Sequence, residues 1–391
     1  MRPARQALRF THLLVRNWRN FTKADVDLGG RVFLTGPSSV GKSNFLDIVC
    51  FLSDLASPGL GFQEAVRKRG GVRRLRCLAA RQESDLALVV HAGDGQNPAE
   101  WEYELVFNQE DQRQPSLKRE RLSHDGEEIL VRPDKDDDED PVRLSHSLLE
   151  QGGLRKELRD FAAFLETVRC LHPVPALMRD PPRPAGSRPD PSGADILEEI
   201  AATLDKSRHA RLRLIQETLR GAVPQLGQLE AYRDSHGRPH LRARHEHWRP
   251  QGAWQSEEQL SDGTLRLIGL VWAVISGVGP LLIEEPEASL HPEIIRLIPQ
   301  MLTRLARRSG RQLLLSTHSL DLLCGEGVET AEILILNPAE AGTLVRPAFE
   351  LKEAADLLDR GALATEPAPV GDEAAAQDRQ MGLFGETPQP E

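Results

Sequence analysis

Cysteine is scarce in this sequence and thinly spread. The 391 residues contain four cysteines, no two of which form a C-x-x-C pair: Cys50, Cys77, Cys170 and Cys324. This spacing gives no indication of a zinc site or of a disulfide framework, and it is typical of a reducing compartment. We therefore expect free thiols and a cytoplasmic protein.

Long apolar segments are also missing. The first ten residues, MRPARQALRF, lack the apolar core of a signal peptide. The longest run without charge, residues 267–283, is slightly short for a membrane span and is interrupted by Gly277, Gly279 and Pro280. We expect a buried helix followed by a buried strand there, and no membrane partner.

Positive charge is in deficit, but acid and base are unevenly distributed. The 49 Lys and Arg against 59 Asp and Glu give a net charge of −10, and much of the acid lies in residues 133–141 and after residue 366. In contrast, the stretch RKRGGVRRLR holds six basic residues and no acid: Arg67, Lys68, Arg69, Arg73, Arg74 and Arg76. This cluster predicts salt-dependent contacts with DNA or RNA phosphates, or else a solvated loop that faces a protein partner.

The order of apolar segments predicts an α/β fold. Residues 7–35 contain three strand-like segments, and residues 85–132 alternate as an antiparallel meander with an Asp-Gly turn at 125–126. From residue 260 onward, helical and strand segments alternate as in a parallel sheet. Residues 194–220 predict one long helix, and the acidic run 134–140 predicts a mobile loop.

These segments divide the chain into four expected parts. Residues 1–180 form the N-terminal half of a nucleotide-binding head, with the meander as a β lobe. Residues 181–232 are a proline-rich connection and a small helical arm. Residues 233–365 form the other half of the head, and the Pro/Gly/acid-rich tail 366–391 is expected to be disordered.

A phosphate-binding loop carries the first chemical signal. The octapeptide GPSSVGKS matches G-x-x-x-x-G-K-[ST] between an apolar strand, RVFLT, and a helix. Its backbone N–H groups and the helix N-terminus would surround phosphate oxygens, with Lys42 on the β- and γ-phosphates and Ser43 on Mg²⁺. The predicted nucleotide-binding residues are Gly36, Pro37, Ser38, Ser39, Val40, Gly41, Lys42, Ser43 and Asn44.

An acidic strand supplies the groups that such a loop lacks. In LLIEEPEASLH, two carboxylates directly follow a buried apolar run, and burial of carboxylates is costly unless they are paired. We assign Glu284 to Mg²⁺ and Glu285 to the attacking water as general base. The alternative, a solvated strand end, explains neither the adjacency of the two acids nor the preceding apolar run.

Two further motifs resemble those of ABC-type ATPases. The segment LSDG, which opens an apolar helix with Ser261, Asp262 and Gly263, resembles the signature motif, and LLLSTHS resembles the strand that ends in the switch histidine, His318. With all motifs in this order, residues 8–337 resemble the ATPase domains of the OLD (overcoming lysogenization defect) and RecF-like branch. These domains are related to SMC proteins and to AAA-type ATPases of bacterial defence systems.

The resemblance implies an ABC-type head that dimerises on Mg-ATP. The signature residues of one subunit would cap the γ-phosphate held by Lys42 of the other, and His318 would sense the γ-phosphate. A loop would cross the dimer interface with Glu287, Ala288, Ser289, Leu290 and His291.

The sequence departs from the branch at several places. The metal-side acid is Glu284 where many relatives carry Asp. No glutamine follows the strand of VRCLHP, where the Q-loop is expected, and Gln63 and Gln82 are weak candidates. The chain is too short between its motifs for a long coiled coil, and the segment after ILILNP carries no TOPRIM nuclease pattern, so we expect any effector to be a separate protein.

The tail contains one short pattern. QMGLF resembles the peptide by which replication and repair proteins dock on the bacterial sliding clamp, with Gln380, Leu383 and Phe384 as contacts. A five-residue match also arises by chance.

Taken together, the sequence predicts a Mg²⁺-dependent ATP hydrolase. It would control a nucleic acid or a partner effector in phage defence or genome maintenance. The alternatives are a nucleotide-dependent scaffold that sequesters a separate toxin or nuclease, and a clamp-associated DNA-repair ATPase.

Overall fold

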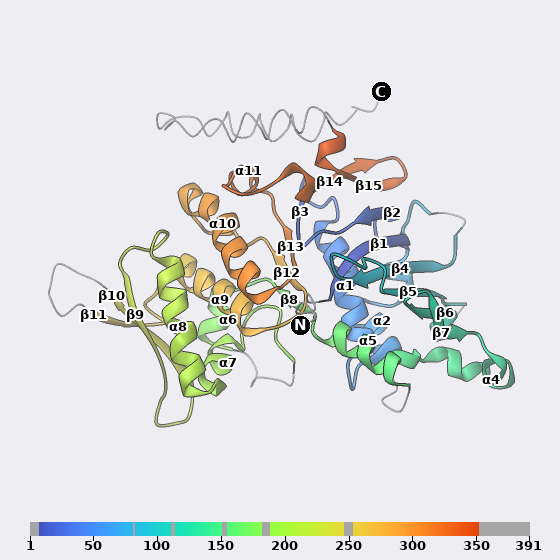
Figure 1. Ribbon diagram of the computed structural model, residues 1–391, viewed down its shortest axis with the longest axis horizontal. Helices are drawn as coiled ribbons and strands as arrows, with labels where there is room; N and C mark the ends of the chain where they lie inside the picture. The colour runs from blue at the N-terminus through green and yellow to red at the C-terminus, as the bar shows by residue number, and fades with distance from the viewer. Residues whose placement is uncertain are drawn as a thin grey trace. The chain divides into compact units, whose positions relative to one another are not determined.

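The computed structural model describes residues 8–80, 83–110, 114–150, 155–181, 188–245 and 253–351. The chain forms two compact units, each assembled from separated segments (Figure 1). The first unit takes its described residues from 1–168, 311–318 and 329–391, and the second from 169–310 and 319–328. The four-part division along the sequence stays a prediction.

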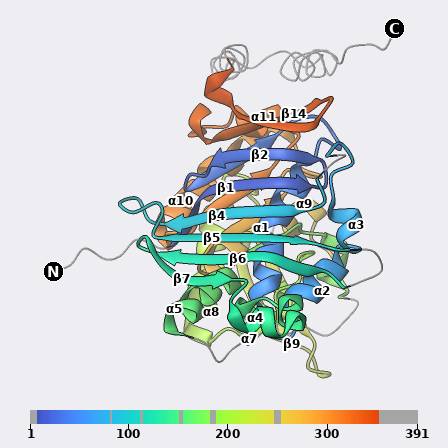
Figure 2. The same cartoon turned by 90° about the vertical axis from the view of Figure 1, so that its right-hand side faces the viewer.

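The first unit is a mixed sheet with helices. Its strands follow the order β7-β6-β5-β4-β1-β2-β15-β14-β3-β13. Figure 2 shows the part of this sheet from β2 through β1, β4, β5 and β6 to β7. Their bounds are β1 (Arg9–Trp18), β2 (Phe21–Asp27), β3 (Arg31–Thr35), β4 (Leu86–Gly93), β5 (Trp101–Asn108), β6 (Ser116–His124), β7 (Glu127–Arg132), β13 (Leu313–Ser316), β14 (Ile333–Ala339) and β15 (Gly342–Pro347).

The helices of this unit are short apart from the one that follows the phosphate loop. They are α1 (Lys42–Ala56), α2 (Gly61–Lys68), α3 (Val72–Leu75), α4 (Lys135–Glu139) and α5 (Lys156–Glu166), with the 3₁₀ turns η1 (Pro141–Ser145), η2 (Leu148–Glu150), η3 (Thr330–Glu332) and η4 (Ala348–Glu350). α1 buries an apolar face that includes Phe45, Ile48, Phe51 and Leu55. This burial anchors the helix whose N-terminus meets the phosphate loop.

The predicted meander is confirmed. β4 to β7 pair antiparallel in sequence order. Asp125 and Gly126 both have positive φ, 52° and 80°, as a two-residue type I′ hairpin turn requires. The alternation in the sequence therefore fixed the register in which one face of the sheet is buried.

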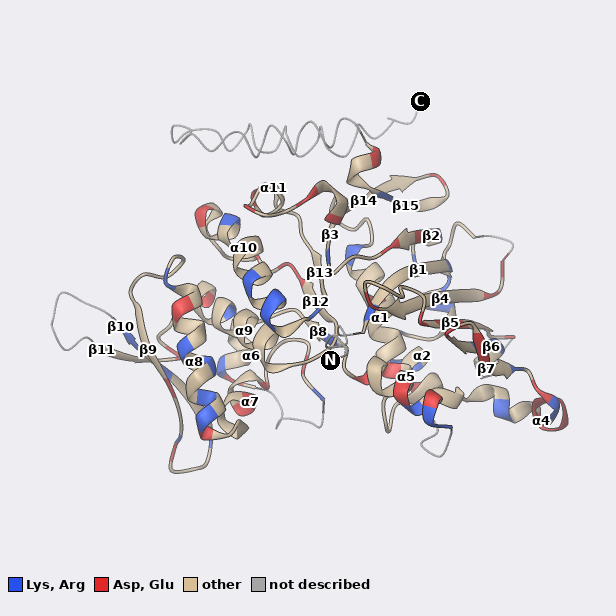
Figure 3. Cartoon of the chain, in the orientation of Figure 1, with Lys and Arg blue, Asp and Glu red and all other residues tan. Residues whose placement is uncertain are grey.

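The acidic run 134–140 is not a mobile loop. Asp134 caps α4 in a reciprocal capping box with Asp137, and Asp137 accepts two hydrogen bonds from the buried Arg132. Figure 3 shows the acid gathered on α4. The prediction from charge density was wrong because one buried cation and a helix N-terminus stabilise this negative charge.

The second unit contains the other strands and longer helices. Its elements are β8 (Arg169–Leu171), α6 (Pro175–Arg179), α7 (Ile196–Ala202), α8 (Asp205–Leu219), β9 (Leu226–Arg233), β10 (Pro239–His245), β11 (Ala253–Ser256), α9 (Asp262–Ser276), β12 (Leu281–Glu284), α10 (Pro292–Ser309) and α11 (Leu320–Leu323). β12 pairs parallel with β8. As predicted, the uncharged run forms a buried helix, α9, and a buried strand, β12.

Two features of the second unit differ from expectation. The predicted long helix is broken between α7 and α8, because Thr203 and Leu204 take extended ψ angles of 138° and 137°. Arg208 donates to the carbonyls of Ala201 and Thr203 and so satisfies the exposed helix end. In addition, β9, β10 and β11 form a small antiparallel sheet that we did not predict.

The cysteines also differ in part from expectation. Cys77 and Cys324 are free thiols, whereas Cys50 and Cys170 are not. The expectation of free thiols is therefore wrong for Cys50 and Cys170. Among the described helices, none has the length and apolar character needed to cross a membrane.

Candidate nucleotide site

Parallel strands bring the phosphate loop and the switch histidine together in the first unit. β3 pairs parallel with β13, with Leu34 opposite Ser316. The Thr317 N–H then donates to the Leu34 carbonyl at 2.9 Å. Because parallel strands end at the same edge of a sheet, residue 318 follows β13 beside the loop that follows β3.

The phosphate loop requires glycine at two of its positions. Gly36 and Gly41 have φ angles of 151° and 111°. A Cβ on Gly36 would collide with the carbonyl of Leu336, and one on Gly41 would collide with the side chain of Asn20. α1 begins at Gly41 without a side-chain cap, which leaves an anion-binding helix N-terminus.

Lys42 is buried inside this loop. Its ammonium donates to the carbonyls of Gly36 and Pro37 at 2.8 and 2.9 Å, and it lies 3.1 Å from Nδ1 of His318. An ammonium only donates, so this histidine nitrogen accepts and the imidazole proton resides on Nε2. The structure thus brings together two of the three predicted catalytic residues.

Asn20 supports the phosphate loop through hydrogen bonds and was not singled out from the sequence. Its amide donates to the carbonyl of Val40 and, at 2.6 Å, to Oγ1 of Thr343. Thr343 donates to the same carbonyl at 2.6 Å, and Asn44 donates to Oδ1 of Asn20 at 2.8 Å. These bonds fix the last turn of the phosphate loop. The only signal in the sequence was a polar residue in the tight connection between the first two strands.

The acidic loop, defined as residues 284–291, follows β12 in the second unit. Glu284 and Glu285 are half-buried and Glu287 is buried. Glu285 and Ser289 adopt left-handed φ angles of 45° and 65°, which side chains rarely take. The carbonyls of Glu285 and Glu287 accept from Ala288 and Leu290, so two turns close the loop.

His172 lies where the Q-loop glutamine was expected. It follows β8, the parallel neighbour of β12, and its Nδ1 donates to the carbonyl of Glu284 at 3.3 Å. Gln63 instead donates to the carbonyls of Pro115 and Ser145 in the first unit, and Gln82 lies outside the described residues. The sequence signal for His172 was its position directly after a short apolar strand.

The signature segment, defined as residues 260–263, packs on the acidic loop. Ser261 caps α9 by accepting from the Thr264 N–H at 3.2 Å. A Cβ added to Gly263 would lie 2.8 Å from Cδ2 of Leu290 and 3.5 Å from the carbonyl oxygen of Ser289. The second unit therefore joins two of the motifs that the sequence placed more than twenty residues apart.

Arg179, which is not part of the signature segment, holds that segment in place. This role was not predicted from the sequence. It donates to the carbonyls of Glu257 and Leu260 at 3.0 and 2.8 Å, and it lies 2.7 Å from the carboxylate of Asp262. Arg179 ends the short helix α6 (Pro175–Arg179), immediately before the segment that we predicted as a proline-rich connection, and no sequence pattern singled it out.

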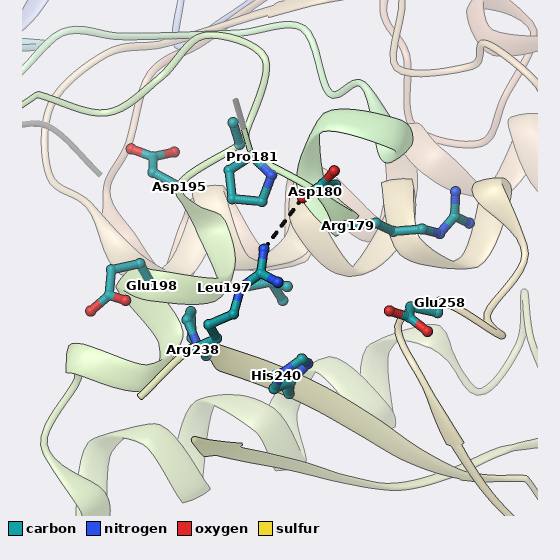
Figure 4. A pocket seen from close by; sticks show the side chains of 11 residues that line it. Arg179, Asp180, Pro181, Asp195, Leu197, Glu198, Arg238, His240 and Glu258 are labelled. Atoms are coloured by element: carbon teal, nitrogen blue, oxygen red, sulfur yellow. Dashed lines mark hydrogen bonds and ion pairs between the residues drawn. The ribbon is translucent and has the colours of Figure 1, made fainter. Parts of the chain in front are cut away.

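A pocket of about 400 Å³ lies beside Arg179 (Figure 4). Its charged side chains pair with one another or with neighbours: Arg238 lies 3.4 Å from Asp180, and His240 lies 2.6 Å from Glu257. The hydrogen bond to Glu257 and the nearby acids raise the pKa of His240 above its usual value. Asp195 also lines the pocket, and its Oδ1 has no hydrogen-bond partner among the described residues.

The basic stretch is not a set of unopposed charges. It forms α2 and α3, and Arg69 is buried with its guanidinium on Asp47 and Asp54 at 2.8 and 2.9 Å. Arg67 pairs with Glu64, and Lys68 pairs with Asp54. Acids on α1 pair with Lys68 and Arg69, and a neighbour on α2 pairs with Arg67, whereas Arg73 and Arg74 are exposed.

The remaining predicted residues divide between the units. Lys42, Ser43 and His318 belong to the first unit, and the signature segment and the acidic loop to the second. The clamp-peptide residues Gln380, Leu383 and Phe384 lie outside the described residues.

The donor set fits Mg²⁺ bound together with a nucleotide. Mg²⁺ takes one or two protein oxygens and completes its shell with phosphates and water. In the first unit, the phosphate loop offers the hydroxyl of Ser43 and a space at its glycines that a Cβ would fill. No cluster of three or more His, Cys, Asp or Glu that could hold a metal occurs among the described residues.

Comparison with known proteins gives one family and a fold. The family model described as "AAA domain, putative AbiEii toxin, Type IV TA system" matches residues 31–324. The chain is 32% identical over 71 residues to the phosphonates import ATP-binding protein PhnC 1 of Synechococcus sp. (strain JA-2-3B'a(2-13)). That match covers 18% of this chain and 27% of the relative's length.

Solved structures of SMC heads cover most of the chain. An SMC head bound to the C-winged helix domain of ScpA matches with a TM-score of 0.54 and 13% identity, over 86% of this chain and 97% of that one. The SMC head domain from Thermotoga maritima matches with a TM-score of 0.49 and 12% identity, over 87% and 98%. The first match confirms the predicted fold class, the α/β head of ABC-type P-loop ATPases.

Proposed function

The chain belongs to the family of AAA domains described as "AAA domain, putative AbiEii toxin, Type IV TA system", and from this premise we propose that it is a Mg²⁺-dependent ATP hydrolase. The observation that carries the proposal is the built phosphate loop, in which Lys42 is buried against loop carbonyls and His318. Within the family we assign it to the OLD/RecF-like branch on the signature and acidic motifs, and to the cytoplasm.

Each part of the site has a chemical role in this proposal. The loop N–H groups and Lys42 bind the phosphates. When the nucleotide binds, the ammonium of Lys42 gives up its hydrogen bonds to the loop carbonyls and donates to the negatively charged phosphate oxygens instead. Ser43 and Glu284 would hold Mg²⁺, which supplies neutralising charge at the phosphates. Glu285 orients the attacking water and takes its proton, and His318 donates from Nε2 to a phosphate oxygen.

We further propose that ATP joins two copies of the chain head to head. Ser261, Asp262, Ser289 and His291 are exposed, so the signature segment and the tip of the acidic loop are open to a second copy. The two segments pack on each other, and one contact surface would therefore present both.

The output of the cycle is proposed to be control of a separate effector in phage defence. The family description names a toxin of a type IV toxin–antitoxin system, and one similar SMC head is bound to a partner protein, ScpA. Arg73 and Arg74 would add a weak, salt-dependent contact with nucleic acid. The rival functions are a nucleotide-dependent scaffold and a repair ATPase docked on the sliding clamp.

Two variants test the proposal. Lys42→Ala removes the cation at the phosphates and is expected to weaken ATP binding by at least about tenfold, a loss of about 1.4 kcal/mol, measured by calorimetric titration. Unchanged ATP affinity in Lys42→Ala would show that the site is assigned wrongly.

Glu285→Gln separates the functions. It is expected to bind ATP but not hydrolyse it, and to accumulate as a dimer in light scattering. A scaffold would keep its effector sequestered in this variant, whereas a hydrolysis-driven controller would not. Removal of residues 366–391 would abolish a clamp-dependent role and leave the other two intact.

A further inference from the structure

Arg266 is a buried arginine that the proposed catalytic cycle does not use. It lies on α9, one turn after Asp262, and its exposed fraction is 6%. Nε and Nη1 of its guanidinium have no hydrogen-bond partner among the described residues. A buried cation with unpaired N–H groups destabilises a fold.

The packing of α9 gives no structural reason for an arginine here. Its neighbours from Leu265 to Val274 are buried and apolar, and an apolar side chain at position 266 would fill the same space without desolvating a charge. The fold alone would therefore be served at least as well by methionine or leucine.

The helix that carries Arg266 contacts the acidic loop. Its first turn packs through Gly263 on Leu290 and the carbonyl of Ser289. Burial lowers the pKa of Arg266, while the carboxylates of Asp262, Glu285 and Glu287 act in the opposite direction. Arg266 is thus a buried cation on the helix that the acidic loop packs against, and carboxylates of that loop act on it electrostatically.

The backbone of the acidic loop is strained at two positions. Glu285 and Ser289 both adopt left-handed φ angles, each of which costs on the order of 1 kcal/mol for a residue with a side chain. Strain of this kind persists only where the surroundings hold it. The turns within the loop contribute two backbone hydrogen bonds, and attraction to a buried cation adds a force directed toward α9.

We propose that Arg266 is a positioning residue that holds the acidic loop, and with it Glu285, in register with the signature segment. It attracts Glu285 and Glu287 from α9, the helix whose first turn contacts the loop. Movement of the signature segment would then be transmitted to the residue that orients water. The consequence for hydrolysis rests on the proposed function, whereas the consequence for the loop does not.

The test compares Arg266→Met, Arg266→Lys and the control Arg304→Met in the full-length chain. Arg304 is exposed on α10 of the same unit, so its variant removes a charge without changing the interior. Hydrogen exchange followed by mass spectrometry reports on peptides covering residues 284–291 and, separately, on α9. ATP affinity and the steady-state hydrolysis rate are measured on the same samples.

We expect Arg266→Met to speed exchange in residues 284–291 by about tenfold or more while the protection of α9 is retained. The hydrolysis rate should fall by about 10- to 100-fold, the range that small misplacements of catalytic groups produce, with ATP affinity within about threefold of the parent. Arg266→Lys keeps the charge, so its loop exchange and its hydrolysis rate should both be close to those of the parent. Arg304→Met should change neither the loop exchange nor the hydrolysis rate.

Two results would overturn the proposal. One is parent-like exchange in the loop of Arg266→Met. The other is faster exchange throughout α9 that lysine does not rescue, since this would show a purely structural role. If the parent protein does not hydrolyse ATP, or if Lys42→Ala does not change ATP affinity, the proposed function fails, while the exchange data still decide the role of Arg266.

Discussion

Arg132 in the first unit and Arg266 in the second are both buried arginines among carboxylates, yet their environments are opposite. The five N–H groups of Arg132 all have acceptors: two oxygens of Asp137, one of Glu120, and the carbonyls of Arg143 and His146. Nε and Nη1 of Arg266 have none among the described residues. All the hydrogen-bond donors of Arg132 are therefore satisfied, whereas Arg266 is a buried charge with two donors that are not satisfied by any described residue.

The pKa values of the two guanidinium groups follow this difference. Burial would lower the pKa of Arg132, but the hydrogen bonds and charges of Asp137 and Glu120 raise it above its usual value. The pKa of Arg266 is lowered, because burial outweighs its acidic neighbours. The comparison teaches that burial of an arginine does not indicate its role; the saturation of its donors does.

The largest expected loss of stability comes from replacing Arg132, whose hydrogen-bond donors are all satisfied. Arg132→Met leaves Asp137 and Glu120 buried without their cation, and it should lower the free energy of unfolding by about 3–5 kcal/mol. Urea unfolding of the full-length chain measures this loss. Lys118→Met, which removes an exposed pair with Glu110, serves as the control and should cost less than about 1 kcal/mol. Equal losses in the two variants would remove the basis of the comparison.

An intermediate loss of stability is expected when Asp137, the carboxylate partner of Arg132, is replaced, and this loss depends on pH. Burial would raise the pKa of Asp137, but the hydrogen bond from Arg132 outweighs it, and the pKa lies below its usual 3.8. A depressed pKa contributes stability above the unfolded-state value, and this contribution is lost as the pH falls through the folded-state value. Asp137→Asn should therefore be less stable at neutral pH by about 2 kcal/mol.

The same pH argument provides the check on this variant. The difference in urea midpoint between Asp137→Asn and the parent should begin to narrow as the pH falls below about 4, where Asp137 of the unfolded parent takes up a proton while the folded carboxylate stays ionised. A difference that stays constant down to about pH 3 would mean that the charge of Asp137 does not stabilise the fold.

The smallest expected effect on stability is that of Arg266→Met. Replacing an unsaturated buried charge with an apolar group should change the free energy of unfolding by less than about 1 kcal/mol, or increase it. The measurement is the same urea titration. A loss as large as that of Arg132→Met would mean that the donors of Arg266 are satisfied in solution and that the two arginines are alike.

The sequence predicted those parts of the site that depend on neighbouring residues. The phosphate loop is one contiguous segment between a strand and a helix, and the structure places Gly36, Gly41 and Lys42 as that pattern requires. The meander, α9 and β12 were likewise predicted from local periodicity. The helix over residues 194–220 failed because a local extended pair, Thr203 and Leu204, interrupts an otherwise helical pattern.

The residues that support the site could not be predicted in this way. Asn20 reaches Thr343, more than three hundred residues away, and Arg179 reaches the signature segment from the short helix α6. The basic stretch misled for the same reason, since the acids that pair with Arg69 lie on another helix. Charge in a sequence window says nothing about the partners that the fold supplies.

The sequence by itself therefore determined the chemistry that the chain offers: a loop for phosphates, a pair of carboxylates, a signature segment and a histidine, each set by local spacing and backbone preference. Only the tertiary structure decided which charges are saturated, and so separated the structural Arg132 from the proposed positioning residue Arg266. The physical reason is that hydrogen-bond saturation depends on three-dimensional neighbours: even the acceptors of Arg132, which are 5 to 14 residues away in the chain, reach it only in the folded arrangement.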